Sequence, residues 1–112
     1  MAVIETFFAV GVLEMQRATA FYVDALGATV AFASPGWSSL RIAGVRIGLF
    51  PAPAHAPGTV GVHFVVDNLV DACDAVERAG GRIADTATEV APGVTTINAT
   101  DTEGNTFTLR QV

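Results

Sequence analysis

The 112-residue sequence predicts an α+β fold built from two βαβββ repeats. The hydrophobic pattern changes from alternating to helical spacing once in each half, and a glycine ends each helical segment. A proline-rich segment separates the halves, and the order of elements then begins again. We expect a single domain over 1–112 with halves of about 1–52 and 58–112. Because each half is too small to be stable alone, we expect their sheets to pair around a shared core or groove.

The first half opens with a strand and a helix. Val3–Val12 is rich in β-branched and aromatic residues, which is typical of a strand. The amphipathic pattern of Glu14–Leu26 then predicts a helix. Its apolar face consists of Ala18, Phe21 or Tyr22, Ala25 and Leu26. Gly27 stands at the C-cap, because glycine takes the left-handed conformation at little cost. We expect Phe21 and Tyr22 to be core anchors.

Three short strands and a linker complete the first half. The strands are expected at Thr29–Ala33, Trp37–Ala43 and Arg46–Phe50, with turn chemistry at Ser34-Pro35-Gly36 and at Ala43-Gly44. The linker, Pro51–Gly58, holds three of the five prolines and therefore predicts neither a helix nor a central strand.

The second half repeats this order. Val60–Val66 is a predicted strand, and Asp67 or Asn68 can cap the following helix. The apolar stripe of that helix is Leu69, Ala72, Cys73 and Val76, and Gly80-Gly81 ends it. Strands are then expected at Arg82–Asp85, Val94–Thr100 and Thr106–Gln111.

The charge balance limits the classes of partner. Six arginines, no lysine and eleven acidic residues give a net charge of −5, and the arginines are scattered. This argues against nucleic acid, whose phosphates require clustered basic residues, and mildly favours cationic or neutral small partners. No apolar run approaches the roughly 20 residues that cross a bilayer. Glu5 interrupts the N-terminal segment where a signal peptide would be positively charged and then apolar, so we expect a cytoplasmic protein without membrane contact.

The single cysteine, Cys73, excludes an internal disulfide and a cysteine-based zinc cage. Since it lies in the helical pattern, we expect a small core residue and no nucleophile. Neither a Gly-x-Ser-x-Gly elbow nor a Walker-type lysine is present. No catalytic residue is therefore predicted from these motifs.

Four segments in order along the chain carry recognisable motifs. They are Phe21-Tyr22 with Leu26-Gly27 at the helix end, Val66–Ala72 at a strand-to-helix junction, Ala79-Gly80-Gly81, and Asp101–Asn105, in which Thr102 replaces a proline. Together they resemble the vicinal oxygen chelate superfamily of glyoxalase I, bleomycin-resistance proteins, fosfomycin-resistance enzymes and extradiol dioxygenases. The resemblance implies a cup-shaped mixed sheet with helices on its outer face, and a homodimer.

The resemblance also implies where a divalent metal would be held. Counting from the motifs, the ligand positions fall at Phe7, Gly48 (within a residue or so), Gly61 and Thr108. Metal-dependent members carry His, Glu or Gln there. Phe and Gly offer no side-chain donor and a Thr hydroxyl is a weak ligand, so we predict no metal site and no cofactor.

The remaining candidates line the expected groove. We predict ligand binding by Phe7, Trp37, Phe50, His63, Asn98 and Thr108. Trp37 is either a stacking wall for a flat ligand or an anchor at a rim or dimer interface. His63 is a wall residue, a structural histidine, or a metal ligand or general base. The other histidine, His55, lies in the linker, and neither histidine forms a ligand cluster with Glu5 or Asp101.

The function that follows is metal-free binding of a small molecule, with sequestration of an antibiotic or metabolite as its use. One alternative is an enzyme of the same superfamily (a lyase, isomerase or dioxygenase) with displaced metal ligands or with His63 as base. Another is an interaction module whose groove is closed by side chains and whose function lies in dimerisation.

Overall fold

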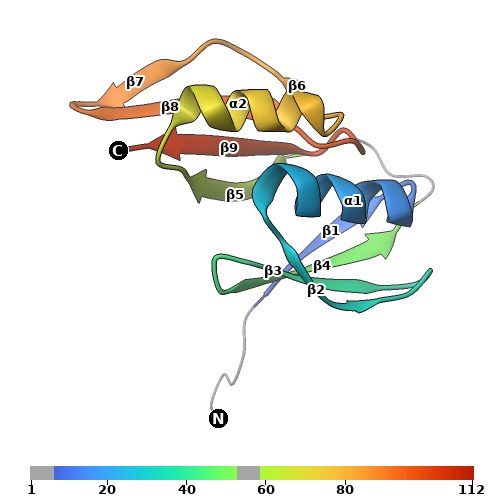
Figure 1. Ribbon diagram of the computed structural model, residues 1–112. Coiled ribbons are helices and arrows are strands. Elements are labelled where there is room, and N and C mark those ends of the chain that lie inside the picture. The colour runs from blue at the N-terminus through green and yellow to red at the C-terminus, as the bar shows by residue number, and fades with distance from the viewer. Residues whose placement is uncertain (1–6, 53–58) are drawn as a thin grey trace. The chain divides into compact units, whose positions relative to one another are not determined.

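A computed structural model describes residues 7–52 and 59–112. The chain divides into two compact units, Met1–His55 and Ala56–Val112, each of which has one helix packed on one sheet (Figure 1). The expected strand residues before Phe7, and residues 53–58 of the expected linker with His55, lie outside the described residues. Pro51, the first residue of the expected linker, instead ends the strand Val45–Pro51. No helix in the described part of the chain has the length and apolar character to span a membrane.

The first unit follows the predicted order of elements. These are β1 (Phe8–Val12), α1 (Met15–Leu26), β2 (Thr29–Ala33), β3 (Ser38–Ile42) and β4 (Val45–Pro51). The sheet has the order β1-β4-β3-β2, in which β1 runs parallel to β4 and the other pairs are antiparallel. Helix α1 packs on β3 and β4 and covers one face of this sheet.

The core of the first unit lies between α1 and the sheet. Phe21 and Tyr22 are 1% and 2% exposed, which confirms them as core anchors. Alternate strand residues meet them, since successive side chains point to opposite faces of a sheet. The buried hydrophobic strand residues are Val10, Val12, Leu40, Ile42, Ile47 and Leu49. Gly27 ends α1 with φ 68°, in the left-handed conformation predicted for it.

The second unit has the same connectivity with one strand more. Its elements are β5 (Thr59–Val65), α2 (Leu69–Arg78), β6 (Arg82–Ile83), β7 (Thr88–Ala91), β8 (Val94–Thr100) and β9 (Thr106–Gln111). The sheet order is β5-β9-β8-β6, with β5 parallel to β9, and β7 also pairs with β8. Strands β5, β9 and β8 thus repeat the arrangement of β1, β4 and β3. The α+β class and the repeated order of elements are confirmed.

The extra strand β7 corrects the prediction of three strands after α2. The predicted strand Arg82–Asp85 pairs only as far as Ile83, because the Asp85 carboxylate accepts the backbone N–H of Asn98 at 2.9 Å. A strand carbonyl would otherwise take that bond. Pairing resumes at Thr88, and all four residues of β7 are exposed. Such a strand has no apolar alternation, so periodicity could not reveal it.

Candidate functional site

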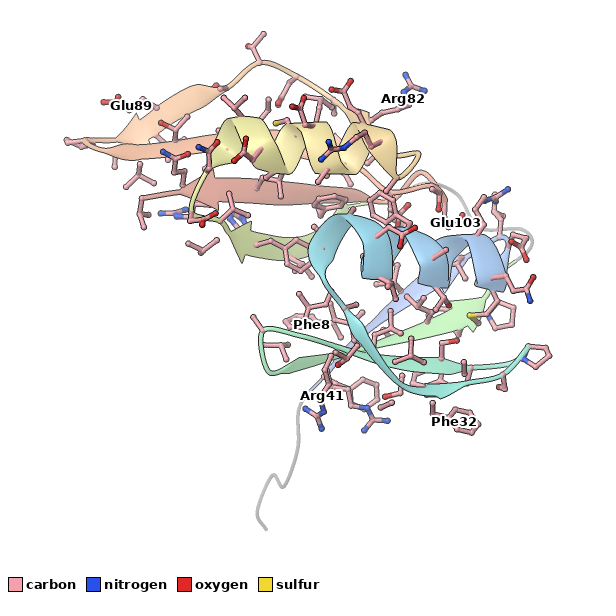
Figure 2. All side chains as sticks on the ribbon, viewed as in Figure 1. Phe8, Phe32, Arg41, Arg82, Glu89 and Glu103 are labelled. Atoms are coloured by element: carbon pink, nitrogen blue, oxygen red, sulfur yellow. The ribbon has the colours of Figure 1, made fainter. Side chains whose placement is uncertain are left out.

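Three of the six predicted site residues lie on the face of the first sheet that α1 does not cover. Because Ile47 and Leu49 point to the helix, alternation along β4 places Arg46, Gly48 and Phe50 on the opposite face. We call this surface the aromatic face; it consists of Phe7, Trp37, Ser39, Arg41, Arg46, Gly48 and Phe50. Figure 2 shows Arg41 on the side of the sheet turned away from α1.

Trp37 lies directly on Gly48. A Cβ atom built on Gly48 would collide with the Cζ2 and Cη2 atoms of the indole. The preceding turn fixes the tryptophan, because the Ser34 hydroxyl donates to the Trp37 carbonyl at 2.9 Å and accepts from the Trp37 amide at 3.0 Å. The ring therefore occupies the space into which any side chain at position 48 would extend.

Phe7 and an arginine extend this contact. The rings of Phe7 and Trp37 meet edge to face, with centroids 6.0 Å apart and an interplanar angle of 82°. The Arg46 guanidinium carbon lies 4.4 Å from the Phe7 ring centroid, and its Nε donates to the Ser39 hydroxyl at 3.0 Å. Phe7 remains 40% exposed. The strands thus hold an aromatic pair and a guanidinium in one cluster.

The other three predicted residues form a polar row on the second sheet. The Thr108 hydroxyl donates to Asn98 Oδ1 at 2.8 Å, and Asn98 Nδ2 donates to Asp85 Oδ2 at 2.9 Å. His63 pairs in register with Thr108 and is exposed. The polar row is therefore His63, Thr108, Asn98 and Asp85. The sequence patterns predicted no role for Asp85, although an aspartate at the end of a predicted strand is a signal for a side chain that bonds to the backbone.

The donor set of the predicted ligand positions does not fit a divalent ion. Trp37 covers Gly48. Because β4 contains no His, Cys, Asp or Glu, a ligand position one residue before or after Gly48 would also lack a strong donor. Gly61 has no donor, and the Thr108 hydroxyl is engaged by Asn98. Within residues 7–52 and 59–112, no three His, Cys, Asp or Glu side chains come together as a metal site would require.

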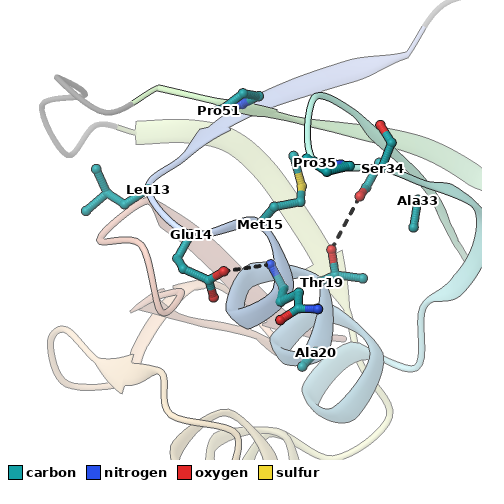
Figure 3. A pocket seen from close by; sticks show the side chains of 11 residues that line it. Leu13, Glu14, Met15, Thr19, Ala20, Ala33, Ser34, Pro35 and Pro51 are labelled. Carbon is teal, nitrogen blue, oxygen red and sulfur yellow. Dashed lines mark hydrogen bonds between the residues drawn. The ribbon is translucent and has the colours of Figure 1, made fainter.

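A cavity of about 860 Å³ lies elsewhere in the first unit, between the start of α1 and the β2–β3 turn (Figure 3). It is lined mainly by apolar side chains, among them Leu13, Met15, Pro35 and Pro51. None of the six predicted residues lines it, and the sequence carried no signal for it beyond the two prolines. Three of its polar side chains already have partners in the fold. Thr19 and Ser38 hydrogen-bond each other at 3.5 Å, and Glu14 caps α1.

Asp101 has a structural role in the turn that the sequence predicted. Its buried carboxylate accepts the backbone N–H groups of Glu103 and Asn105 at 2.8 and 2.9 Å, and also the Asn105 side-chain amide at 3.1 Å. These bonds hold the β8–β9 hairpin. A second cavity of about 480 Å³ beside it is lined by Arg82, Thr100 and Thr102 among others.

Cys73 is half-buried on α2, which places it at the edge of the helix stripe instead of in the fully buried core. Burial raises the pKa of its thiol, and the neighbouring Glu77 and Asp74 carboxylates raise that pKa further. A thiol of raised pKa stays protonated at neutral pH and is a poor nucleophile. This agrees with a packing role.

Comparison with known proteins covers nearly the whole chain. Residues 6–109 match the Glyoxalase/Bleomycin resistance protein/Dioxygenase superfamily. The genomically encoded fosfomycin resistance protein FosX from Listeria monocytogenes has a similar structure, with a TM-score of 0.84 and 16% identity over 100% of this chain and 95% of that chain. No curated protein matches the sequence significantly.

Two further solved structures are similar in fold. A glyoxalase/bleomycin resistance protein/dioxygenase family enzyme from Burkholderia phytofirmans PsJN gives a TM-score of 0.78 at 19% identity, over 95% of this chain and 96% of that chain. A mutant of the Listeria FosX, complexed with Mn(II) and a dihydroxypropylphosphonic acid, gives 0.80 at 16% identity, over 97% and 90%. The resemblance predicted from the four motifs is thereby confirmed.

Proposed function

Because this chain belongs to the Glyoxalase/Bleomycin resistance protein/Dioxygenase superfamily, we propose that it binds a small organic molecule and that no divalent metal takes part at the positions that relatives use for one. Sequestration of an antibiotic or metabolite is the use that this proposal assigns to the binding. The one observation that carries the metal-free part is the contact between Trp37 and Gly48.

That contact changes the chemistry of the site. In a metal-dependent relative, a side chain at position 48 would reach from the sheet toward an ion. Here an indole ring occupies that space and meets Phe7 edge to face. The result is an apolar surface with a few polar groups at its edge, which is the usual composition of a small-molecule site.

The exposure of the aromatic face supports binding. Phe7 and Phe50 are 40% and 38% exposed, and Trp37 is half-buried. Large aromatic side chains contribute most of the energy of many binding sites because they bury much area with few rotatable bonds. The proposal therefore assigns Phe7, Trp37 and Phe50 to contacts with the ligand. The polar contacts predicted for His63, Asn98 and Thr108 stay predictions, and that of His63 is tested below.

Metal analysis tests the first half of the proposal. Protein produced in medium supplied with Zn, Ni, Fe and Mn should contain substoichiometric metal by mass spectrometry. Addition of Mn(II) or of a chelator should leave the melting temperature unchanged, since a ligand that does not bind cannot stabilise the fold. A tightly bound stoichiometric ion would contradict the proposal.

Ligand screening with a matched pair of variants tests the second half. Compounds that raise the melting temperature should lose affinity when Phe50, on the aromatic face, is replaced by alanine. Phe8→Ala is the control, since Phe8 is 45% exposed on the same sheet and pairs with Ile47 on the face toward α1. Equal losses of affinity in both variants, or stabilisation by no compound, would contradict binding at the aromatic face.

A further inference from the structure

We propose that the ligand of the aromatic face is a flat aromatic molecule carrying an anionic group such as a carboxylate, sulfonate or phosphate. This inference rests on the proposed function and adds the charge of the ligand. It depends on two arginines of the aromatic face, Arg41 and Arg46, and on where the acidic residues of the chain lie.

The net charge of −5 is confined to one half of the chain. Residues 1–52 contain three acidic residues and three arginines, which cancel. Residues 58–112 contain eight acidic residues and three arginines, which leave −5. The overall acidity therefore describes the second unit and gives no guide to the charge preference of the first sheet.

In the described part of the first unit, the acidic residues are confined to α1 and its cap, while two of the three arginines lie on the sheet. The four strands contain no Asp or Glu, and the described acidic residues, Glu14 and Asp24, cap or lie in α1. Arg41 and Arg46 are register partners on β3 and β4, so their side chains leave the sheet side by side on the aromatic face. The sheet thus presents two positive charges among its aromatic rings.

The guanidinium of Arg46 is positioned by its neighbours. It stacks 4.4 Å from the Phe7 centroid, while its Nε donates to Ser39. Arg41 is exposed, and its terminal nitrogen lies 3.5 Å from the Gly44 carbonyl. A guanidinium presents a planar fork of donors that matches the oxygens of a carboxylate or phosphate. A ring that contacts Phe7 or Trp37 would carry an attached anionic group within reach of this arginine pair.

Charge complementarity also selects this occupant over a second copy of the chain. A two-fold interface formed by this face would bring it against its own image. Two surfaces that each carry Arg41 and Arg46 would then meet, and like charges across an interface are unfavourable. A small anion avoids this repulsion.

The unique tryptophan allows a direct test. In a ¹⁵N-labelled sample of the full chain, Trp37 supplies the one indole N–H signal. We would titrate three probes with the same ring system, 2-naphthoate, 2-naphthamide and 2-naphthylmethylammonium. Naphthoate should shift the indole signal and bind at least about tenfold more tightly than the amide. The ammonium probe should bind more weakly than the amide, and added salt should weaken the binding of naphthoate selectively.

Two substitutions that each remove one positive charge distinguish a local effect of Arg41 on binding from a general effect of the net charge. Arg41→Gln should lower the affinity for naphthoate more than that for naphthamide, so that the preference for naphthoate falls. Arg78→Gln is the control, since Arg78 is exposed in the last turn of α2 in the second unit. It should leave both affinities unchanged. Arg41→Lys should restore part of the preference, because it keeps the charge and loses the planar fork.

The outcomes distinguish this inference from the proposed function. Equal binding of naphthoate and naphthamide, with a shift of the Trp37 signal, would overturn the inference and leave the proposed function intact. Naphthoate binding that leaves the Trp37 signal in place, or no naphthoate binding, would overturn the inference. A third outcome would also overturn the inference. If the protein is a dimer that none of the probes dissociates, and if Arg41→Gln makes that dimer tighter, the occupant of the aromatic face is a second copy of the chain. If the screen described above yields no ligand as well, both proposals fail.

Discussion

At the scale of single residues, the pair Trp37 and Gly48 decides the character of the candidate site. The glycine is required by close approach of the indole, because no side chain fits beneath the ring. The tryptophan in turn depends on the Ser34 hydroxyl, which holds its backbone. An aromatic ring thus occupies the point of the sheet at which the resemblance predicts a metal ligand.

Gly48→Ala should lower the free energy of unfolding by about 1–3 kcal/mol, since the ring must move or the strand must shift. The same change in a Trp37→Ala background should cost clearly less, and the difference measures the contact. Urea denaturation followed by far-UV circular dichroism gives both values. Gly36→Ala is the matched control, because a Cβ there meets nothing within 4 Å. Equal costs of Gly48→Ala in the two backgrounds would show that the ring does not rest on Gly48.

A substitution of His63 distinguishes the hypothesis of a binding protein from that of an enzyme. Its side chain is exposed in the polar row, so His63→Ala should change the free energy of unfolding by no more than about 0.5 kcal/mol. If it contacts the ligand, the variant should bind any ligand found by screening more weakly. Calorimetry measures this, with Asp67→Ala, an exposed position in the β5–α2 loop, as control. A measurable turnover that His63→Ala abolishes would favour the enzyme, whereas a loss of fold stability alone would identify a structural histidine.

At the scale of elements, the two helices begin with different caps. The Glu14 carboxylate accepts the backbone N–H groups of Gln16 and Arg17 at 3.3 and 2.7 Å, which satisfies two donors that have no partner within α1. Asn68 accepts from Asp71 at 3.0 Å in α2, as one of the two caps that the sequence proposed. Glutamate is an unusual cap because its longer side chain must fold back, and periodicity alone could not assign this role.

Removal of the Glu14 cap should cost stability. We expect Glu14→Ala to lower the free energy of unfolding by about 1 kcal/mol, and Glu14→Asp to lower it less because a shorter carboxylate can still accept from the first turn. Urea denaturation measures both. The neighbouring exposed position supplies a control in Gln16→Ala, which removes no bond to the backbone of α1. Identical stabilities of Glu14→Ala and Gln16→Ala would show that the cap contributes nothing.

The environment of Cys73 on α2 predicts slow alkylation. Because burial and then Glu77 and Asp74 raise the pKa of the thiol, the folded protein should react with iodoacetamide at pH 8 more slowly than the urea-unfolded chain. Glu77→Gln should lower that pKa and speed the reaction of the folded protein, whereas Glu89→Gln in β7 should not. Mass spectrometry follows the reaction. An unchanged rate in Glu77→Gln would mean that burial alone limits the thiol.

At the scale of the whole molecule, the two units share one connectivity and differ in what their sheets carry. The first sheet has aromatic rings and arginines, and the second has a row of hydrogen-bonded polar groups. The two units therefore keep the same order of elements although their side chains differ. For this reason the repeat is visible in the order of the strands and is weak in residue identity. The single domain expected over residues 1–112 stays a prediction with a direct test.

A single domain requires that the units unfold together. Trp37 fluorescence reports the first unit, so Ile97→Val, a change in the core of the second unit, should lower the urea midpoint of that fluorescence. The expected loss is about 0.5–1.5 kcal/mol. Far-UV circular dichroism of the same samples should give the same midpoint. If Ile97→Val shifts the dichroism curve and leaves the fluorescence midpoint unchanged, the two units fold independently.

The sequence by itself determined most of the elements and their order, because hydrophobic period, capping residues and glycine C-caps act over a few neighbouring residues. Gly27 and the anchors Phe21 and Tyr22 behave as that local chemistry predicts. It also showed that the predicted ligand positions hold no strong donors. Tertiary structure alone decided the rest. Strand β7 forms because β8 offers it a partner, and Asp85 joins the polar row through a contact 13 positions along the chain. The indole of Trp37 covers Gly48 because strand register brings β3 and β4 side by side, and a contact between different strands is not encoded in any local pattern.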